Sequence, residues 1–418
     1  MITVDEVFPV DVRASVGPAG TIKRLFQNRE FFQKRGYEMT IFANHFTHSH
    51  GIKSYYELRE MTALPQQVNY TAVTGSGGFK KKVISFIKQW AQDTKLVAYF
   101  MVRYKENRTE EILLDTYIEK GRRPDIVVFH DFYGCFYYLT HRQSDDNAKV
   151  ALFLHSDGKD IDQMYAKYPK LVGSKIYHRL YLDFIYNIEH VSGLVFISKI
   201  AYNEFLKRHP HYEKSKMFTA VNGIDDMPLI KLQPSCSAKY RLCTSGTVCE
   251  RKGQYIIVEA MKRMNKDILK DTHLTIMGVG PDYKKLVDEV NSSELSKNVS
   301  FLGNVPNLKM HEKLSAENIY CLMSNNEGLP IAILEAMRAG LPIISTPIAG
   351  IPETVDERNG FLIEPDVNQL TNVLNHLPDY DWEALGKSSR QRFVEEFTFQ
   401  RMLNDYANMF DSLVFNKS

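Results

Sequence analysis

The sequence lacks several features that would mark a specialised class of protein. Its 418 residues include only five cysteines, which are odd in number, scattered and never spaced as CxxC. This usage argues against a zinc or redox site and predicts free thiols in a reducing cytoplasm. No basic start followed by an apolar run opens the chain, and no uninterrupted apolar stretch of about 18 residues occurs in it. We therefore expect a protein that is neither secreted through a signal peptide nor membrane-spanning.

The chain also lacks an excess of charge of either sign. It has 52 Lys and Arg against 50 Asp and Glu, a net charge of +2, whereas proteins that bind phosphate backbones are usually more basic. We expect no nucleic-acid partner. Hydrophobic residues make up 44% and charged residues 24%, as in soluble globular proteins. Because a single core stops growing at roughly 250 to 300 residues, two domains are expected.

The first half of the chain alternates between strand and helix patterns. A strand near Ile2–Val10 is followed by a small-residue loop, VGPAG at Val16–Gly20, a helical run Ile22–Lys34 and a strand Met39–Ala43. Such units build parallel sheets whose helix starts face ligands. Further strands are predicted at Ile126–Phe129, Ala151–Leu154, Gly193–Ile197 and Met217–Val221.

A second alternation follows residues 226–238, which contain two prolines and no continuous apolar face and are interpreted as a linker. Its strands are predicted at Tyr240–Ser245, Leu274–Met277, Val299–Leu302, Ile319–Leu322 and Leu341–Ser345. We expect an N-terminal domain over 1–225, a second over 239–395, and a C-terminal helix over 396–418 that packs back on the first. Ligands of such α/β sheets bind at the carboxyl ends of the strands.

The most informative stretch is SNNEGLPIAILEAMRAGLPIIST, Ser324–Thr346. Pro330 suits the first position of a helix and Gly340 the position just past its end. The unpaired amides and the dipole of a helix start attract phosphate, and Gly328 allows a close approach to the backbone. The stretch therefore predicts a diphosphate site.

Two glutamates bracket this helix start with the spacing ExxxxxxxE. Glu335 lies about five residues into the helix, roughly 7 Å from its start, where it would accept hydrogen bonds from ribose hydroxyls. Glu327 precedes the helix on the other side of the diphosphate and would hold a sugar hydroxyl. The alternative is a pair of acidic residues on a solvated helix.

Other segments occur in a fixed order around this stretch: VGPAG, FLHSDG (153–158), AVNGID (220–225), SGTVCERKGQ (245–254), MGVGP (277–281), FLGNVP (301–306), PIAGIPETV and NGFLIEP. With them the chain resembles the retaining glycosyltransferase family of GT-B architecture, the polysaccharide-biosynthesis type of glycosyl transferases group 1. The resemblance implies an α/β fold in which two Rossmann-like domains, for acceptor and donor, face across a cleft. We expect no essential metal and no cofactor beyond the nucleotide-sugar substrate.

The resemblance also implies roles for single residues. Lys252 would bind the donor phosphates, and His155 would lie against the transferred sugar. Thr247 stands where the family usually has an arginine, which leaves a second cation open, with Arg251 as the candidate. The implied catalytic residues are His155, Glu327 and Lys252, and the implied donor contacts are Gly20, Thr247, Arg251, Lys252, Val305, Glu327, Gly328, Leu329, Pro330 and Glu335.

Three further features have less specific interpretations. His130 and Asp131 follow a predicted strand and would orient His155 or contact the acceptor. The DxD triplets Asp160–Asp162 and Asp379–Asp381 follow no good strand and are interpreted as surface acids rather than metal ligands. The basic amphipathic segment Phe79–Trp90 is either a membrane-surface helix or an ordinary core-packed one.

We therefore expect a cytoplasmic, configuration-retaining hexosyltransferase, with peripheral contact to the inner face of the cell membrane as an open option. It would move a hexose or N-acetylhexosamine from a nucleotide-diphosphate sugar to a hydroxyl of a glycan or a lipid-linked saccharide. Two alternatives remain: a nucleotide-sugar epimerase or sugar phosphorylase, and a non-catalytic homologue that acts as a partner subunit.

Overall fold

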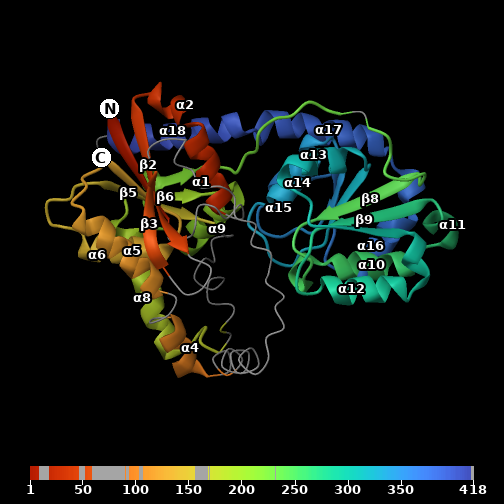
Figure 1. Cartoon of the computed structure of the whole chain (residues 1–418), viewed down its shortest axis with the longest axis horizontal. Coiled ribbons are helices and arrows are strands. Elements are labelled where there is room, and N and C mark those ends of the chain that lie inside the picture. Colours follow the sequence, from red (N-terminus) through yellow and green to blue (C-terminus); the bar gives the residue numbers. More distant parts are fainter. Residues whose placement is uncertain are drawn as a thin grey trace. The chain divides into compact units, whose positions relative to one another are not determined.

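The structure, a computed structural model, describes residues 1–8, 18–46, 52–58, 90, 94–102, 107–155, 168, 170–230 and 232–415. The chain divides into two compact units. The first unit consists of Met1–Ile197, Tyr202–Ala220 and Leu403–Ser418, and the second of Ser198–Ala201 and Val221–Met402. Each unit contains its own sheet with helices packed against it (Figure 1).

The sheet of the first unit has the strand order β3-β2-β1-β4-β5-β6-β7. Its neighbouring strands are parallel except for β2 and β3, which are antiparallel. The central strands are buried along their length, as expected for a parallel sheet covered on both faces. The strands are β1 (Ile2–Phe8), β2 (Tyr37–Phe46), β3 (Ile52–Leu58), β4 (Ile126–Phe129), β5 (Lys149–Leu154), β6 (Gly193–Phe196) and β7 (Met217–Thr219).

The helical run predicted at Ile22–Lys34 is two helices, and the first begins earlier than expected. It starts at Pro18, within the segment predicted as a loop, since proline suits a first helical turn. Asn28 separates the two helices, and its side-chain amide donates to the Arg24 carbonyl at 2.9 Å. The helices are α1 (Pro18–Gln27), α2 (Arg29–Gln33), α4 (Lys95–Met101), α5 (Asn107–Glu119), α6 (Phe132–His141), α8 (Lys175–His190), α9 (Lys199–Arg208), α18 (Phe399–Phe415) and the 3₁₀ turn η3 (Lys214–Lys216).

The sheet of the second unit is parallel throughout, in the order β10-β9-β8-β11-β12-β13. Its strands are β8 (Tyr240–Ser245), β9 (Thr272–Met277), β10 (Val299–Gly303), β11 (Ile319–Leu322), β12 (Ile343–Ser345) and β13 (Gly360–Leu362). Its helices are α10 (Gln254–Lys262), α11 (Lys266–Leu269), α12 (Tyr283–Asn291), α13 (Asn307–Ser315), α14 (Ile331–Arg338), α15 (Ile351–Thr354), α16 (Val367–Asn375), α17 (Trp382–Glu396), and the 3₁₀ turns η4 (Glu250–Lys252), η5 (Glu294–Lys297) and η6 (Leu377–Asp379).

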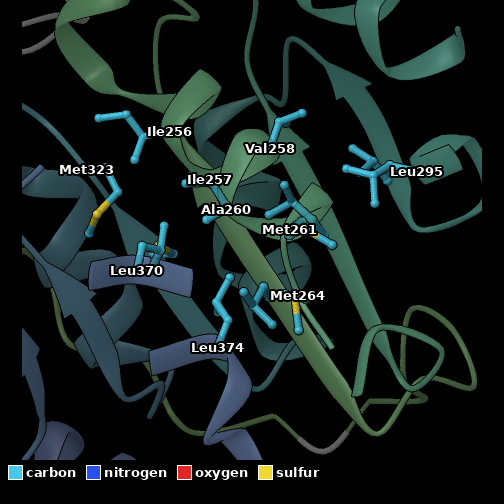
Figure 2. Close-up of a cluster of buried hydrophobic side chains, with 14 of the residues drawn as sticks. Ile256, Ile257, Val258, Ala260, Met261, Met264, Leu295, Met323, Leu370 and Leu374 are labelled. Carbon is cyan, nitrogen blue, oxygen red and sulfur yellow. The ribbon is translucent and has the colours of Figure 1, made fainter. Parts of the chain in front are cut away.

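The core of the second unit is built around α10. Figure 2 shows Ile257, Ala260 and Met261 of this helix among the buried side chains that include Leu370 and Leu374 of α16. Each fully buried side chain of this kind contributes about 1.5 to 3 kcal/mol relative to exposure. The start of α10, and the η4 turn that precedes it, are thereby anchored to the sheet.

The segment predicted as an interdomain linker, 226–238, belongs to the second unit. The His311 Nε2 donates to the Pro228 carbonyl at 2.9 Å, and the Ser235 amide donates to the Ala316 carbonyl at 3.3 Å. These bonds hold the segment against α13, so its proline-rich composition marks an irregular packed stretch.

The C-terminal helix α18 contributes to the first unit from Leu403 onward. Phe410 packs on Phe32 and Tyr37, with ring centroids 5.8 and 5.4 Å apart, and Tyr406 stacks on Phe153 at 4.9 Å. The predicted fold class, two Rossmann-like α/β domains with a C-terminal helix on the first, is confirmed. Across the described parts of the chain, the helices are all too short or too polar to span a bilayer.

Candidate functional site

The loop after β8 brings Lys252 next to the loop after β11. Gly253 has a left-handed backbone (φ 68°), and a Cβ there would lie 2.0 Å from the Met323 carbonyl oxygen, so glycine is required for this close approach. The Asn325 amide donates to the Arg251 carbonyl at 3.0 Å. The two loops are therefore joined through their backbones at the carboxyl edge of the sheet.

Three donors converge on one carboxylate oxygen at this junction. The Lys252 Nζ lies 2.6 Å and the Arg251 Nη1 3.3 Å from the Glu327 Oε1, and the Ser324 hydroxyl donates to the same oxygen at 2.6 Å. The side chains of Lys252 and Glu327 are only 12% and 8% exposed, whereas that of Arg251 is 46% exposed. The structure thus brings together three of the predicted site residues and adds Ser324, to which we had assigned no role.

Hydroxyl side chains fix the position of Ser324. The Thr346 Oγ1 donates to the Ser324 carbonyl at 2.7 Å, and the Ser345 Oγ donates to the Leu322 carbonyl at 2.8 Å. Ser324 and Thr346 are the two ends of the motif selected from the sequence; Ser324 lies two residues after β11, and Thr346 directly follows β12. Polar residues just after two neighbouring parallel strands are the signal that would have identified this link.

The helix start predicted to bind phosphate is formed by α14. Pro330 precedes the helix as its N-cap, with ψ at 118°, rather than occupying its first position, because its backbone is extended. The Pro330 side chain forms no capping hydrogen bond, so the first backbone amides of α14 are left to other partners. Leu329 and Pro330 are buried, the Gly328 carbonyl accepts from the Gly350 amide at 2.9 Å, and Gly340 ends the helix with φ at 76°, as predicted.

Glu335 is a half-buried residue of α14 whose charge acts on Tyr320 of β11. Burial raises the pKa of Tyr320, and the negative charge of Glu335 adds to the shift. The Tyr320 hydroxyl lies 3.0 Å from the Ser245 hydroxyl, at the last residue of β8. Glu335 is therefore close enough to act on Tyr320, while Glu327 is paired with Lys252.

The first unit holds a second set of predicted residues. His130 follows β4 and His155 follows β5, and the His130 Nδ1 lies 2.8 Å from the His155 Nε2. The other His130 nitrogen, Nε2, lies 3.0 Å from the Oε2 of Glu6 on β1. Glu6 was missed by the sequence analysis. Burial, together with the neighbouring His130, lowers the pKa of His155 to about 3, which keeps its ring neutral at pH 7.

Asp131 has a local structural role as a helix cap. It is the N-cap of α6, where its Oδ1 accepts from the Gly134 amide at 2.6 Å. Burial raises the pKa of Asp131 despite this hydrogen bond. The structure joins His130 directly to His155 and uses Asp131 to cap the following helix.

Comparisons with known proteins identify a family for part of the second unit. Residues 233–392 match the profile of the family described as glycosyl transferases group 1. Residues 233–392 form a group 1 glycosyltransferase domain. The chain is also 29% identical over 160 residues to the amylovoran biosynthesis glycosyltransferase AmsK of Erwinia amylovora, covering 35% of this chain and 38% of that protein.

Another relative covers more of the chain. This is the GDP-mannose-dependent monoacylated alpha-(1-6)-phosphatidylinositol monomannoside mannosyltransferase of Corynebacterium glutamicum, 27% identical over 241 residues, or 53% of this chain and 62% of that protein. The chain spans about half the length of the curated relatives it matches. The sucrose-phosphate synthase of Thermosynechococcus elongatus shares the fold over 99% of both chains, with a TM-score of 0.67 and 17% identity.

Within the group 1 domain, Thr247 and Val305 lie in the loops after β8 and β10. Thr247 is exposed, and its carbonyl accepts from the Gln254 Nε2 at 3.1 Å. Val305 is partly exposed between β10 and α13. Both positions are at the carboxyl edge of the sheet, where ligands of such folds bind. Their donor contacts remain predictions.

The group 1 domain also contains a cavity of about 390 Å³ between α10 and α12. It is lined by four carboxylates, Glu250, Glu259, Asp282 and Glu289, and by one lysine, Lys285. This lining repels a diphosphate, and none of the predicted donor residues belongs to it. The cavity is therefore unsuited to the predicted donor.

The remaining predictions fall partly outside the described residues. Gly20 lies in the first turn of α1 in the first unit, rather than in a loop as we had expected. Asp160–Asp162 and residues 79–89 lie outside the described residues. Of the second triplet, Asp379 ends η6, and Asp381 is the N-cap of α17, where its Oδ1 accepts from the Ala384 amide at 3.0 Å.

Proposed function

We propose that the protein is a retaining glycosyltransferase that moves a hexose or N-acetylhexosamine from a nucleotide-diphosphate sugar to a hydroxyl acceptor. The observation that carries this proposal is the convergence of Lys252, Arg251 and Ser324 on Glu327 beside the start of α14. A cluster of cations at an uncapped helix start suits a diphosphate. The acceptor that we propose is a glycan or a lipid-linked saccharide.

The ion pair of Lys252 and Glu327 has a direct role in this scheme. The Lys252 Nζ lies 2.6 Å from the Glu327 Oε1. An arriving diphosphate brings negative charge that attracts Lys252 and Arg251 and repels the carboxylate. Lys252 then stabilises the charge that builds on the leaving diphosphate, and Glu327 becomes available to accept a hydrogen bond from a sugar hydroxyl.

Retention of configuration follows from the roles that we assign. Glu327 and His155 position the sugar and do not react covalently, and a donor phosphate oxygen takes the acceptor proton. His155 is neutral, as its lowered pKa of about 3 supports, and can accept a hydrogen bond from a hydroxyl. We propose further that the reaction needs no divalent metal and no cofactor apart from the donor.

The names of the relatives support the donor and acceptor classes. One relative is named as a GDP-mannose-dependent mannosyltransferase that acts on a phosphatidylinositol mannoside, and another is named for amylovoran biosynthesis. These names favour a hexose donor and a polysaccharide or lipid-linked acceptor for this chain.

The test is a donor panel with the full chain in the presence of EDTA. Nucleotide-diphosphate sugars are compared for thermal protection and for release of the nucleotide, with Glu335→Ala and a matched surface variant, Glu312→Ala on α13. We expect one donor to protect and to be cleaved, with loss of both effects in Glu335→Ala alone. Protection that appears only with added metal would refute metal independence, and protection by no donor would refute the transferase.

We also propose peripheral contact with the inner face of the cell membrane through Phe79–Trp90. Of this segment the structure describes Trp90, whose side chain is 53% exposed. An exposed tryptophan that follows Lys80, Lys81, Lys82 and Lys88 in the sequence suits an anionic surface. Co-sedimentation with vesicles containing phosphatidylglycerol should exceed that with phosphatidylcholine vesicles, and Trp90→Ala should weaken it; equal binding to both would contradict the proposal.

A further inference from the structure

Two neighbouring carboxylates of β1 are both buried, and their surroundings differ. Asp5 accepts two hydrogen bonds from Arg122, at 2.8 and 2.7 Å, and one from the Tyr117 hydroxyl at 2.9 Å. Glu6 points to the opposite face of the sheet, since side chains alternate along a strand. Its Oε2 meets only the His130 Nε2, and its Oε1 has no hydrogen-bond partner within the described part of the chain.

This arrangement at Glu6 would be unfavourable if its only role were to stabilise the fold. Burying a carboxylate with one of its oxygens unpaired carries a desolvation penalty, and a well-packed apolar side chain in place of a buried ion pair is often at least as stable. Asp5 shows that the same strand can hold a fully paired carboxylate. That only one oxygen of Glu6 has a hydrogen-bond partner among the described residues therefore points to a function that depends on its contact with His130.

The contact extends across three adjacent strands to His155. In the parallel register Glu6 lies opposite Val128, two residues before His130, and His155 follows the neighbouring strand β5. The two histidine rings lie 5.1 Å apart at 26°. Phe153 stacks on the His130 ring at 4.7 Å, and this aromatic cover restricts rotation of the imidazole.

We infer that Glu6 is a positioning residue that sets the tautomer of His155 through His130. A carboxylate only accepts hydrogen bonds, so the His130 Nε2 donates to Glu6. A neutral His130 then has its lone pair on Nδ1, and the His155 Nε2–H must donate to it. The neutral His155 is left with its own lone pair on Nδ1.

The other ionisable groups near this chain are compatible with that assignment. Tyr406 of α18 packs against Phe153, and burial, with the nearby Glu6, raises the pKa of Tyr406, so its hydroxyl stays neutral. Asp131 lies beside His130, but its Oδ1 accepts from the Gly134 amide. Burial lowers the pKa of His155 to about 3, in agreement with a neutral ring.

The tautomer of His155 affects which ligand groups the ring can bind, an inference that rests on the proposed function. An Nδ1 lone pair accepts a hydrogen bond from a hydroxyl, the group that every saccharide carries. If the ring had the opposite tautomer, Nδ1 would donate and would favour a carboxylate or carbonyl ligand. Glu6, from within β1, thereby makes His155 favour ligands that can donate, such as hydroxyl groups, over carboxylates and carbonyls, which only accept.

The experiment is long-range proton–nitrogen NMR of the full chain labelled with ¹⁵N-histidine, at pH 8. Among the 13 histidines, the signals of His130 and His155 are assigned with their glutamine variants. We expect both rings to carry the proton on Nε2 in the unmodified chain. In Glu6→Gln we expect a mixture of tautomers, because an amide both donates and accepts. Asp5→Asn is the matched control and should leave both tautomers unchanged.

The outcomes separate this inference from the proposed function. A proton on the Nδ1 of His155 in the unmodified chain, or unchanged tautomers in Glu6→Gln, would overturn the inference without any assay of activity. The spectrum of the unmodified chain decides this even if the variant fails to fold.

Turnover of the donor found by the panel is measured separately. By analogy with partners that orient metal-bound histidines, we expect kcat/KM of Glu6→Gln to fall about ten- to a hundredfold. Altered tautomers with unchanged turnover would refute a role of His155 in transfer and leave the inference on Glu6 intact.

Discussion

The two units of the protein build their sites in opposite ways. In the second unit, charged groups at the ends of β8 and β11 meet in an ion-pair cluster around Glu327. In the first unit, Glu6, His130 and His155 form a chain of hydrogen bonds, and the side chains of Glu6 and His130 are fully buried. We infer from this difference that a ligand can rearrange the charged cluster of the second unit, whereas the fold fixes the direction of the donated protons in the first.

The largest expected effect tests the charged cluster. Lys252→Ala should lower kcat roughly 100- to 1000-fold, the loss typical of removing one preorganised group that stabilises developing charge. Arg251→Ala, in the same turn but with a side chain 46% exposed, should lower it by less than about tenfold. Turnover of the donor from the panel measures both. Equal losses would show that burial does not distinguish the two cations.

The second prediction compares the two carboxylates of β1 by stability. Asp5→Asn should lower the free energy of unfolding by about 3 kcal/mol, because it breaks a buried, doubly bonded ion pair with Arg122. Glu6→Gln should cost about 1 kcal/mol, because only one oxygen has a hydrogen-bond partner among the described residues. Urea unfolding followed by circular dichroism measures both. A larger cost for Glu6→Gln would mean that Glu6 is mainly structural.

The third prediction concerns pH and the first-unit site. The pKa of His155 is lowered to about 3 in the folded chain and is near 6.5 when unfolded. Between these values the unfolded chain binds the extra proton, so stability falls as pH drops through this window, by at most about 1.4 kcal/mol per pH unit for this group. His155→Gln should therefore flatten the decline of Tm between pH 7 and 5. An unchanged slope would contradict a neutral His155 with a lowered pKa.

The last prediction refines the cluster of the second unit. Ser324→Ala removes the hydroxyl that donates to Glu327 at 2.6 Å and leaves the Thr346 bond to the Ser324 carbonyl in place. The loss of one hydrogen bond to a charged group is worth about 1.5 kcal/mol, or roughly a tenfold fall in kcat/KM. Thr346→Val, measured in parallel, removes the support and keeps the Ser324 hydroxyl. No effect of Ser324→Ala would mean that Lys252 alone positions the carboxylate.

Much of the fold was predictable because several strands are short buried runs between turn residues. β4, β8 and β11 have the predicted bounds. The antiparallel edge strand β3 was not predicted, since nothing in its own residues shows which strand it pairs with. The helix break at Asn28 was missed as well, because the apolar pattern continues through it while the asparagine side chain bonds the backbone.

The two sites also differ in how far their residues could be predicted from the sequence. Lys252, Glu327 and Glu335 lie in motifs whose spacing can be read along the chain. Glu6 lies 124 residues from His130, and its place beside that histidine depends on β1 pairing with β4. Strand order follows from the packing of the whole sheet, so no local pattern around Glu6 could have indicated its partner.

The most direct test of the central claim is calorimetric titration of nucleoside diphosphates into the full chain, with EDTA present. UDP, GDP and ADP are compared on the unmodified protein, on Lys252→Met, and on Lys266→Met, whose ion pair with Glu294 is on the surface. We predict that one diphosphate binds, that Lys252→Met weakens it at least about tenfold, and that Lys266→Met leaves it unchanged. Equal binding to the unmodified chain and to Lys252→Met would contradict a donor site at the Lys252 and Glu327 cluster.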